Sequence, residues 1–358
     1  MARRGGPLCP KRPQWAICRG MTPARTKKPE LLCPAGTPSA LRTAVEAGAD
    51  AVYCGFQNAT NARNFAGLNF TEAELRQAVA FAHARGAKVL LTLNTFPPAG
   101  AMDLWKRAAD AAADIGVDAV ILADPGVAAY CAERHPGLRR HLSVQAAAST
   151  PEAIAWWHRE FGIARAVLPR ILAAGEIRDL VRAIPCEVEA FLFGNHGLMV
   201  EGRCAMSSYL TGRSTNMDGS CSPASHISYE HNLAGDMTMR LGSFAVDCFA
   251  CGQSAGYPTP CKGRYVSTEQ PGGYHAFEEP VTLNLAPILP EMMAAGVAAL
   301  KIEGRQRSKA YVRMVVGAFR AAIDDIAEGR APAMASLLSL TEGGAETTGA
   351  AGGGGRWR

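Results

Sequence analysis

The chain has 358 residues, of which 48% are hydrophobic and 19% are charged, so it can bury one large core, or one core with a subdomain. This composition excludes disorder of the whole chain, and the longest apolar runs are only as long as strands, which excludes a transmembrane helix. The formal net charge of +5 comes from residues 1–30, which hold eight basic residues and one acidic residue, whereas the remainder holds 29 basic and 31 acidic residues. The near-neutral remainder gives no electrostatic argument for a nucleic-acid partner.

Residues 1–29 are expected to form a disordered basic leader. Arg3 and Arg4 stand side by side in it, but no apolar stretch of the length that a secretory signal needs follows them. We therefore expect a cytoplasmic protein, and in that reducing compartment a framework of disulfides is not expected.

Eight short apolar stretches follow in chain order and are predicted to be strands, over residues 31–33, 51–54, 88–93, 119–123, 141–145, 165–169, 187–193 and 299–302. Helical patterns lie between them. Thr71 and Glu74 have the spacing of a capping box, which predicts a helix over residues 71–85. Further helices are predicted over residues 39–47, 101–115, 126–134, 151–161, 174–183, 289–295 and 309–327.

Eight strands, each followed by a helix or a long insert, predict an α/β fold, namely a (β/α)8 TIM-like barrel with a long cysteine-rich insert after strand 7. We expect residues 30–195 to hold barrel strands 1–7, residues 196–285 to form the insert, and residues 286–330 to hold the last strand and its helices. Residues 331–358, with their run of glycines, are expected to be a flexible tail.

Polar residues recur just past the predicted strands, where barrel enzymes carry their chemistry. The candidates for a catalytic role are Asp124, Gln145, Arg170, Glu303 and Arg305. Together they would suit a small ligand that is anionic or rich in oxygen. The alternative is that some of them only cap helices or pair with each other, as Arg170 could with Glu303.

The eleven cysteines fall into groups with different interpretations. Four stand singly in or beside apolar runs, which is typical of small buried residues, and these are Cys33, Cys54, Cys131 and Cys186. Five others crowd into the insert, namely Cys204, Cys221, Cys248, Cys251 and Cys261. Ligand type and spacing alone leave iron–sulfur and zinc open for such a group.

Several long stretches resemble a known family. The stretches LLCPAG at 31–36, AGADAVYCG at 47–55 and TNARNFAGLNF at 60–70 resemble the opening of the U32 "peptidase" family. Four more resemble its UbiU branch, which acts in oxygen-independent ubiquinone biosynthesis: EGRCAMSSYLTG at 201–212, CSPA at 221–224, AGYPTPCKGRY at 255–265 and KIEGRQRS at 301–308. The resemblance runs from about residue 30 to about residue 330.

The resemblance implies a 4Fe–4S cluster, a heterodimer with the protein UbiV, and hydroxylation of the ring of a ubiquinone precursor without dioxygen. Because a cluster alone supplies no oxygen atom, we expect an organic oxygen donor, whose carboxylate Arg170 or Arg305 could bind. The family's cysteine positions map onto Cys204, Cys221 and Cys261, but the first position is Gly197 here, which has no side chain to bind iron. Cys251 is our choice for the fourth ligand, with Cys248 or His196 as substitutes. An open corner that binds a small molecule is a further option.

Four other interpretations stay open. The cysteines could hold zinc, although only one CxxC pair is present. The chain could hydroxylate an RNA base, as other members of the family do, or serve only as a scaffold for UbiV. Peptidase activity is the weakest interpretation, because the sequence contains no HExxH helix and no set of nucleophile and base stands out among its many cysteines and histidines.

Overall fold

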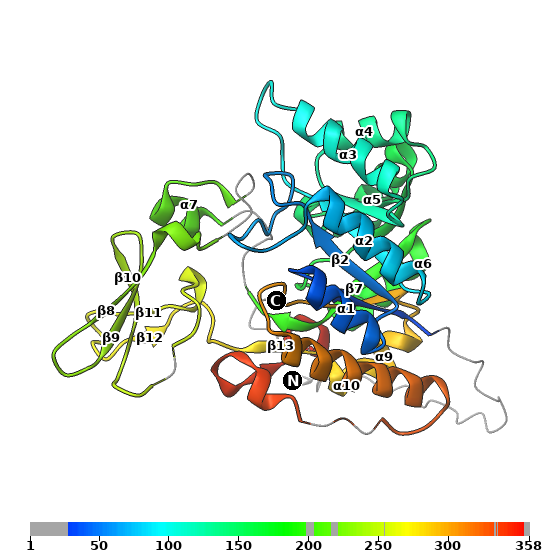
Figure 1. Ribbon diagram of the computed structural model, residues 1–358. Helices are drawn as coiled ribbons and strands as arrows, with labels where there is room; N and C mark the ends of the chain where they lie inside the picture. Colours follow the sequence, from blue (N-terminus) through cyan, green and yellow to red (C-terminus); the bar gives the residue numbers. More distant parts are fainter. Residues whose placement is uncertain are drawn as a thin grey trace, which may run out of the picture.

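The computed structural model describes residues 28–197, 204–215, 221–253, 255–332, 334 and 336–353, so nearly all of the expected basic leader lies outside the described residues. Within these ranges, eight strands form a closed parallel barrel (Figure 1). They are β1 (Glu30–Pro34), β2 (Ala51–Gly55), β3 (Lys88–Leu93), β4 (Ala119–Leu122), β5 (Arg140–Leu142), β6 (Ile163–Val167), β7 (Glu187–Asn195) and β14 (Ala299–Ile302). Because β14 pairs with both β7 and β1, the barrel closes, as the sequence predicts.

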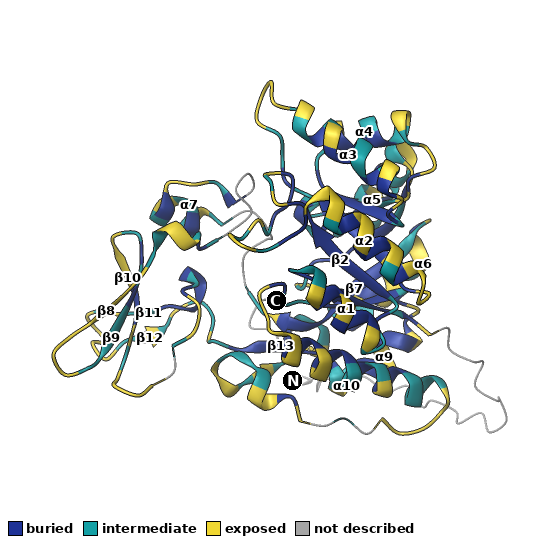
Figure 2. Ribbon diagram, in the orientation of Figure 1, coloured by how far each residue is buried: buried dark blue, intermediate teal, exposed yellow. Residues whose placement is uncertain are grey.

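Helices cover the outside of the barrel and turn their buried faces toward it (Figure 2). They are α1 (Pro38–Glu46), α2 (Glu72–His83), α3 (Asp103–Ile115), α4 (Pro125–Arg134), α5 (Pro151–Phe161), α6 (Ala174–Ala183), α9 (Leu289–Ala294) and α10 (Lys309–Ala327). The predicted capping box begins α2, where Thr71 Oγ1 accepts from Glu74 N at 3.2 Å and Thr71 N donates to Glu74 Oε2 at 2.9 Å. None of the described helices is long and apolar enough to cross a membrane.

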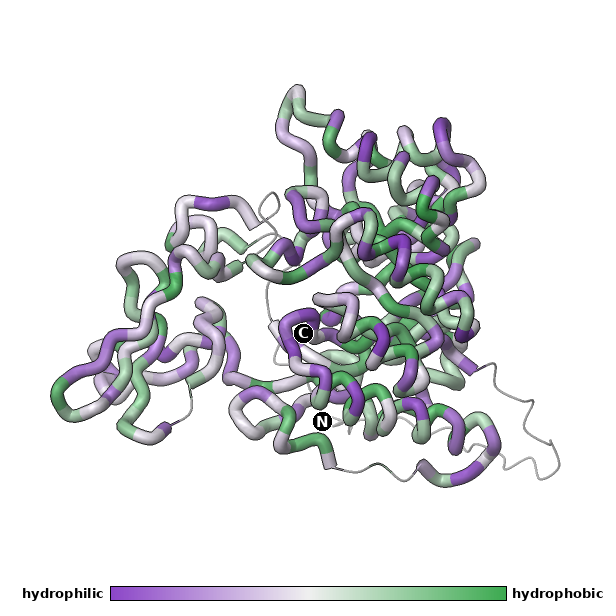
Figure 3. Tube along the Cα trace, in the orientation of Figure 1, coloured by the Kyte–Doolittle hydropathy of each residue, from purple (hydrophilic) through white to green (hydrophobic). Residues whose placement is uncertain are grey.

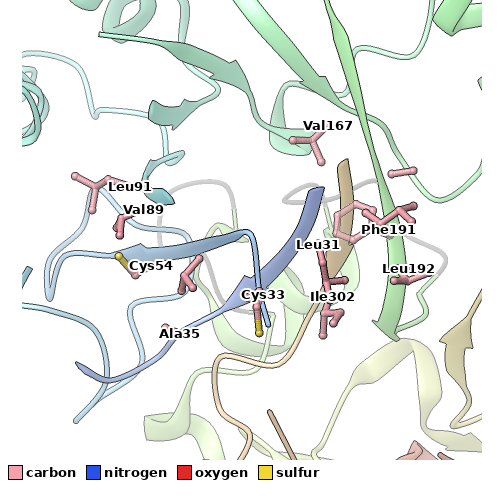
Figure 4. Close-up of a cluster of buried hydrophobic side chains, with 14 of the residues drawn as sticks. Leu31, Cys33, Ala35, Cys54, Val89, Leu91, Val167, Phe191, Leu192 and Ile302 are labelled. Atoms are coloured by element: carbon pink, nitrogen blue, oxygen red, sulfur yellow. The ribbon is translucent and has the colours of Figure 1, made fainter. Parts of the chain in front are cut away.

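The main core lies between the strands and these helices. Figure 4 shows part of it, with Leu31 and Cys33 of β1 close to Ile302 of β14. Cys33, Cys54 and Cys131 are all buried, which agrees with their interpretation as small core residues. The hydrophobic segments gather in the barrel (Figure 3).

One predicted strand ends early. Residues 141–145 were expected to be extended, but β5 ends at Leu142 and a 3₁₀ turn, η1 (Val144–Ala146), follows. The reason is local, because the Ser143 hydroxyl accepts from the backbone N–H of Gln145 at 3.2 Å and so stabilises the turn. This turn places Gln145 at the mouth of the barrel.

The insert between β7 and β14 stands beside the barrel mouth (Figure 1). It contains α7 (Ala205–Thr211) and an antiparallel sheet of β8 (Ile227–His231), β9 (Met237–Leu241) and β10 (Phe244–Phe249), followed by the pair β11 (Arg264–Tyr265) and β12 (Tyr274–His275). A small separate core of Met239, Leu241 and Val246 stabilises it. The chain returns to the barrel at β13 (Thr282–Asn284), which pairs antiparallel with β7.

The last described segment also packs on the barrel. It comprises η5 (Leu338–Leu340), η6 (Glu342–Gly344), β15 (Glu346–Thr347) and η7 (Gly349–Gly352). These residues fall in the range for which the sequence predicts a flexible tail, yet β15 pairs in parallel with β13. A segment of small and polar residues gives no hydrophobic pattern from which such backbone pairing could be predicted.

Candidate functional site

A cavity of about 1030 Å³ lies between the barrel mouth and the insert. Its barrel side is lined by residues past the strand ends, including Asn94, Gln145, Arg170, Glu303 and Arg305. Its insert side is lined by Met239, Phe249, Tyr257, Lys262 and Cys221, among others. Four of the five catalytic candidates from the sequence therefore meet in one cavity, at the end of the barrel where barrel enzymes act.

Two of these candidates neutralise each other. The Arg170 guanidinium forms an ion pair with the Glu303 carboxylate, and it also stacks on the Phe191 ring at 3.5 Å from the ring centroid. The pairing that the sequence offered as an alternative role is thus present in the structure.

Arg305 has a different environment. Its side chain is only 8% exposed, and its two terminal nitrogens donate to neutral acceptors, to Asn61 Oδ1 at 2.5 Å and to Thr92 Oγ1 at 3.2 Å. No carboxylate of the described residues pairs with it, and burial lowers the pKa of Arg305. A buried cation on the wall of a cavity, with no ion-pair partner among the described residues, favours an anionic ligand.

The remaining two candidates differ in position. Gln145 is 4% exposed and lines the cavity, and its side-chain amide makes no hydrogen bond to the described part of the chain. Asp124 is not part of the cavity wall, because it is the N-cap of α4 and accepts from Val127 N at 3.0 Å. Asp124 therefore has the helix-capping role that the sequence left open.

A buried ion pair below the mouth was not predicted. Lys301 Nζ of β14 donates to Glu189 Oε1 of β7 at 2.7 Å, and it lies 4.0 Å from the centroid of the Tyr53 ring. Glu189, which is fully buried, also lies 3.7 Å from Arg165. Lys301 and Tyr53 both line the cavity. The sequence does not reveal this pair, because each charged residue stands alone in an otherwise apolar strand. The two side chains become partners only when the barrel closes and both point into its interior.

Three insert cysteines share one neighbourhood. Cys204 caps α7 and accepts from Ser207 N at 3.4 Å, while the Ser207 hydroxyl donates to the carbonyl oxygen of Cys221. Burial, and then the neighbouring Cys221, raise the pKa of Cys204. Burial, together with Cys221 and Cys204, raises the pKa of Cys261 to about 12. Cys204, Cys221 and Cys261 thus lie near enough for their charges to influence one another.

The CxxC pair lies elsewhere. Cys248 and Cys251 are exposed; the Cys248 sulfur lies 3.6 Å from Thr238 Oγ1, and Cys251 N donates to Asp236 Oδ1 at 3.2 Å. Both therefore sit at the end of the β9–β10 hairpin that is remote from α7. Within the described residues, no three His, Cys, Asp or Glu side chains stand in an arrangement that could hold a metal ion.

The position that lacks a cysteine is open. Among the described residues, a Cβ atom built at Gly197 would meet only Asn195 Nδ2, at 3.7 Å, so a side chain fits there as far as these residues are concerned. The neighbouring His196 has its Nε2 at 3.7 Å from Glu278 Oε2. Burial, with help from Arg170 and Lys262, lowers the pKa of His196 to about 4, so the imidazole is neutral at pH 7.

Comparison with known proteins gives a family. A model described as peptidase family U32 matches residues 36–346. The chain belongs to peptidase family U32. Among its U32 relatives, tRNA hydroxylation protein P1 of Bacillus subtilis is 34% identical over 84% of this chain, and tRNA hydroxylation protein P of Escherichia coli is 32% identical over 88%.

These U32 relatives are longer than this chain, which spans 64% of the Bacillus protein and 72% of the Escherichia coli protein. A third relative, the 23S rRNA 5-hydroxycytidine C2501 synthase of Escherichia coli, is 30% identical over 87% of this chain, which spans 42% of that protein. The names of all three concern hydroxylation of RNA.

Proposed function

We propose that this chain is the iron–sulfur subunit of an oxygen-independent hydroxylase that acts, with a UbiV partner, on the ring of a ubiquinone precursor. The observation that carries the proposal is the position of Cys204, Cys221 and Cys261 in the insert beside a large cavity, with Cys221 on the cavity wall and joined to Cys204 through Ser207. The hydroxylation named for the U32 relatives and the resemblance to the UbiU branch support the same class of reaction.

Three thiols fit an iron–sulfur cluster in their donor chemistry, since thiolates are its usual ligands. Cys204, Cys221 and Cys261 would hold the cluster. The fourth ligand would come from Cys251, Cys248 or His196, although both of these cysteines lie at the end of the β9–β10 hairpin remote from α7 in this structure. Bound there, the cluster would supply one-electron transfer. Burial raises the pKa of Cys204 and of Cys261, so these two thiols are protonated at neutral pH and release protons when they bind iron.

The cavity can hold both an oxygen donor and a ring. Arg305 can pair bidentately with the carboxylate of an organic oxygen donor, whereas Arg170 is already neutralised by Glu303. The side-chain amide of Gln145, which has no hydrogen-bond partner among the described residues, offers a further donor and acceptor to such a ligand. On the opposite wall, Phe249 and Tyr257 present aromatic surface against which a ring can pack.

Hydroxylation of an RNA base is the second candidate, and the U32 relatives favour it. Against it stands the near-neutral charge of residues 31–358, because RNA-binding surfaces usually carry excess positive charge. The two candidate functions can be distinguished by identifying the molecule that stays bound to the protein when it is purified without air together with its partner. Bound quinone precursor supports the first proposal, and bound RNA supports the second.

The first experiment is a measurement of iron, acid-labile sulfide and zinc per chain in protein purified without air together with UbiV. About four irons and four sulfides on this chain would support the cluster. Zinc in their place would mean a structural site. No metal at all would leave this chain as a scaffold and place the cluster chemistry in the partner.

A further inference from the structure

The C-terminal segment 337–353, named here the C-terminal clamp, is attached to the barrel through Thr282 of β13. The Thr282 hydroxyl accepts from Glu342 N at 2.8 Å, and Thr282 N donates to Ala345 O at 3.1 Å. β15 then continues alongside β13. These bonds hold the backbone at Glu342 against the barrel and so limit the positions that its side chain can adopt.

Glu342 pairs with a lysine of the insert. Its carboxylate lies 2.5 Å from Lys262 Nζ, and the Lys262 side chain is only 3% exposed. The same ammonium donates to Asn195 Oδ1 at 3.0 Å and to Val281 O at 3.1 Å, so all three N–H groups are used. Glu342 is the only carboxylate of the described residues that neutralises this buried cation.

Lys262 directly follows Cys261, which is itself 8% exposed. Lys262 also joins three separate parts of the chain, since its partners are the end of β7, the residue before β13 and the clamp. These three bonds therefore tie the backbone next to Cys261 to all three segments.

The clamp also touches the strand end that lacks a cysteine. Gly349 packs on the His196 ring so closely that a Cβ atom there would lie 2.8 Å from His196 Cε1. With φ at +55°, the position also suits glycine. The clamp thus contacts both His196, beside Gly197, and Lys262, beside Cys261.

We propose that the C-terminal clamp positions the Cys261 thiol, and that Glu342 does so as a positioning residue by neutralising Lys262. Removing the carboxylate alone leaves a buried ammonium without a counter-charge, which favours local opening of residues 261–262. The contact itself involves no metal. The proposal rests on the proposed function only in treating Cys261 as a cluster ligand.

Alkylation of the metal-free full chain with iodoacetamide, followed by mass spectrometry of each cysteine, tests this directly. We expect Glu342→Gln to raise the labelling rate of Cys261 roughly tenfold. Glu346→Gln is the matched control, since Glu346 lies in the same segment but is exposed and makes no ion pair with the described residues. The double variant Lys262→Met/Glu342→Gln should restore protection, because it removes the cation as well.

The other cysteines serve as internal standards. Cys248 and Cys251 should react in every variant, and Cys33 and Cys54 in none. Equal labelling of Cys261 in the Glu342→Gln and Glu346→Gln proteins would overturn the proposal. Labelling of Cys33 and Cys54 as fast as that of Cys261 would also overturn it, since the Lys262–Glu342 pair would then stabilise the whole fold. A double variant in which Cys261 is as reactive as in Glu342→Gln would overturn it as well.

A second readout uses the loaded protein and does rest on the proposed cluster. We expect Glu342→Gln to raise the reduction potential of the cluster and Lys262→Met to lower it, because local charge sets that potential. Shifts of the same sign would show that neither charge lies close enough to the cluster to set its potential, and would contradict the placement of this pair beside a cluster ligand. Absence of iron in the parent protein would contradict only the proposed function, and the alkylation result would still stand.

Discussion

Arg170 and Glu303 form an ion pair across the mouth of the barrel, between the segments that follow β6 and β14. The pair leaves Arg305 as the buried guanidinium of the mouth that has no carboxylate partner among the described residues. Two arginines that looked equivalent in the sequence therefore differ in what they can bind.

Arg305→Lys is expected to reduce hydroxylation about tenfold or more, although it keeps the charge. A lysine cannot hold Asn61 and Thr92 and also offer two parallel donors to a carboxylate. The measurement is the yield of hydroxylated precursor without air, in the presence of UbiV. Arg76→Lys is the control, because Arg76 forms an exposed surface pair. Full activity of the Arg305→Lys protein would remove this residue from the binding site.

Cys221→Ala should abolish cluster binding after reconstitution, because it removes one of the three gathered thiols. Iron and sulfide per chain are the readout. Cys131→Ala is the matched control, since Cys131 is buried in the barrel far from the insert in sequence. Unchanged iron content in the Cys221→Ala protein would exclude this cysteine as a ligand.

Gly197→Cys should give an ordinary four-cysteine site, since a Cβ atom at this position meets only Asn195 among the described residues. Iron would then be retained longer in air, and Cys251→Ala should be harmless in that background. Cys251→Ala alone should lower iron retention if Cys251 is the fourth ligand. If it has no effect, the same measurement on Cys248→Ala and His196→Gln identifies the substitute.

Glu189→Gln should lower the free energy of unfolding by about 3–5 kcal/mol, because it leaves the buried Lys301 ammonium without its counter-charge. Urea unfolding followed by circular dichroism provides the measurement. Glu187→Gln should cost less, since the Glu187 side chain is 37% exposed. Equal decreases in the free energy of unfolding in the two variants would mean that the Lys301–Glu189 pair stabilises the fold no more than the partly exposed Glu187 does.

Acid should destabilise the fold through His196. Its pKa falls from the usual 6.5 when unfolded to about 4 when folded, so the unfolded state binds more protons between these values. Stability is therefore complete above about pH 6.5 and declines as the pH falls toward 4. We expect His196→Gln to remove about 1–2 kcal/mol of this decline, measured as urea unfolding at pH 7.5 and pH 5. An unchanged pH slope would show that His196 titrates normally.

The local elements could be predicted because their causes lie within a few residues. Thr71 and Glu74 cap α2 whatever surrounds them, and alternating apolar strands and amphipathic helices specify a closed barrel. Where prediction failed locally, at residues 143–145, the reason was one side-chain bond from Ser143 that competes with the strand.

The sequence by itself determined the barrel, the cysteine-rich insert and the set of polar residues that could meet at the mouth. Only the tertiary structure decided which of those residues are already paired, because Asn61, Thr92 and Glu303 are far from their arginines along the chain. The same holds for Lys301 with Glu189 and for Lys262 with Glu342. A charge takes its chemical role from the partner that the fold brings within a few ångströms, and sequence spacing does not record that partner.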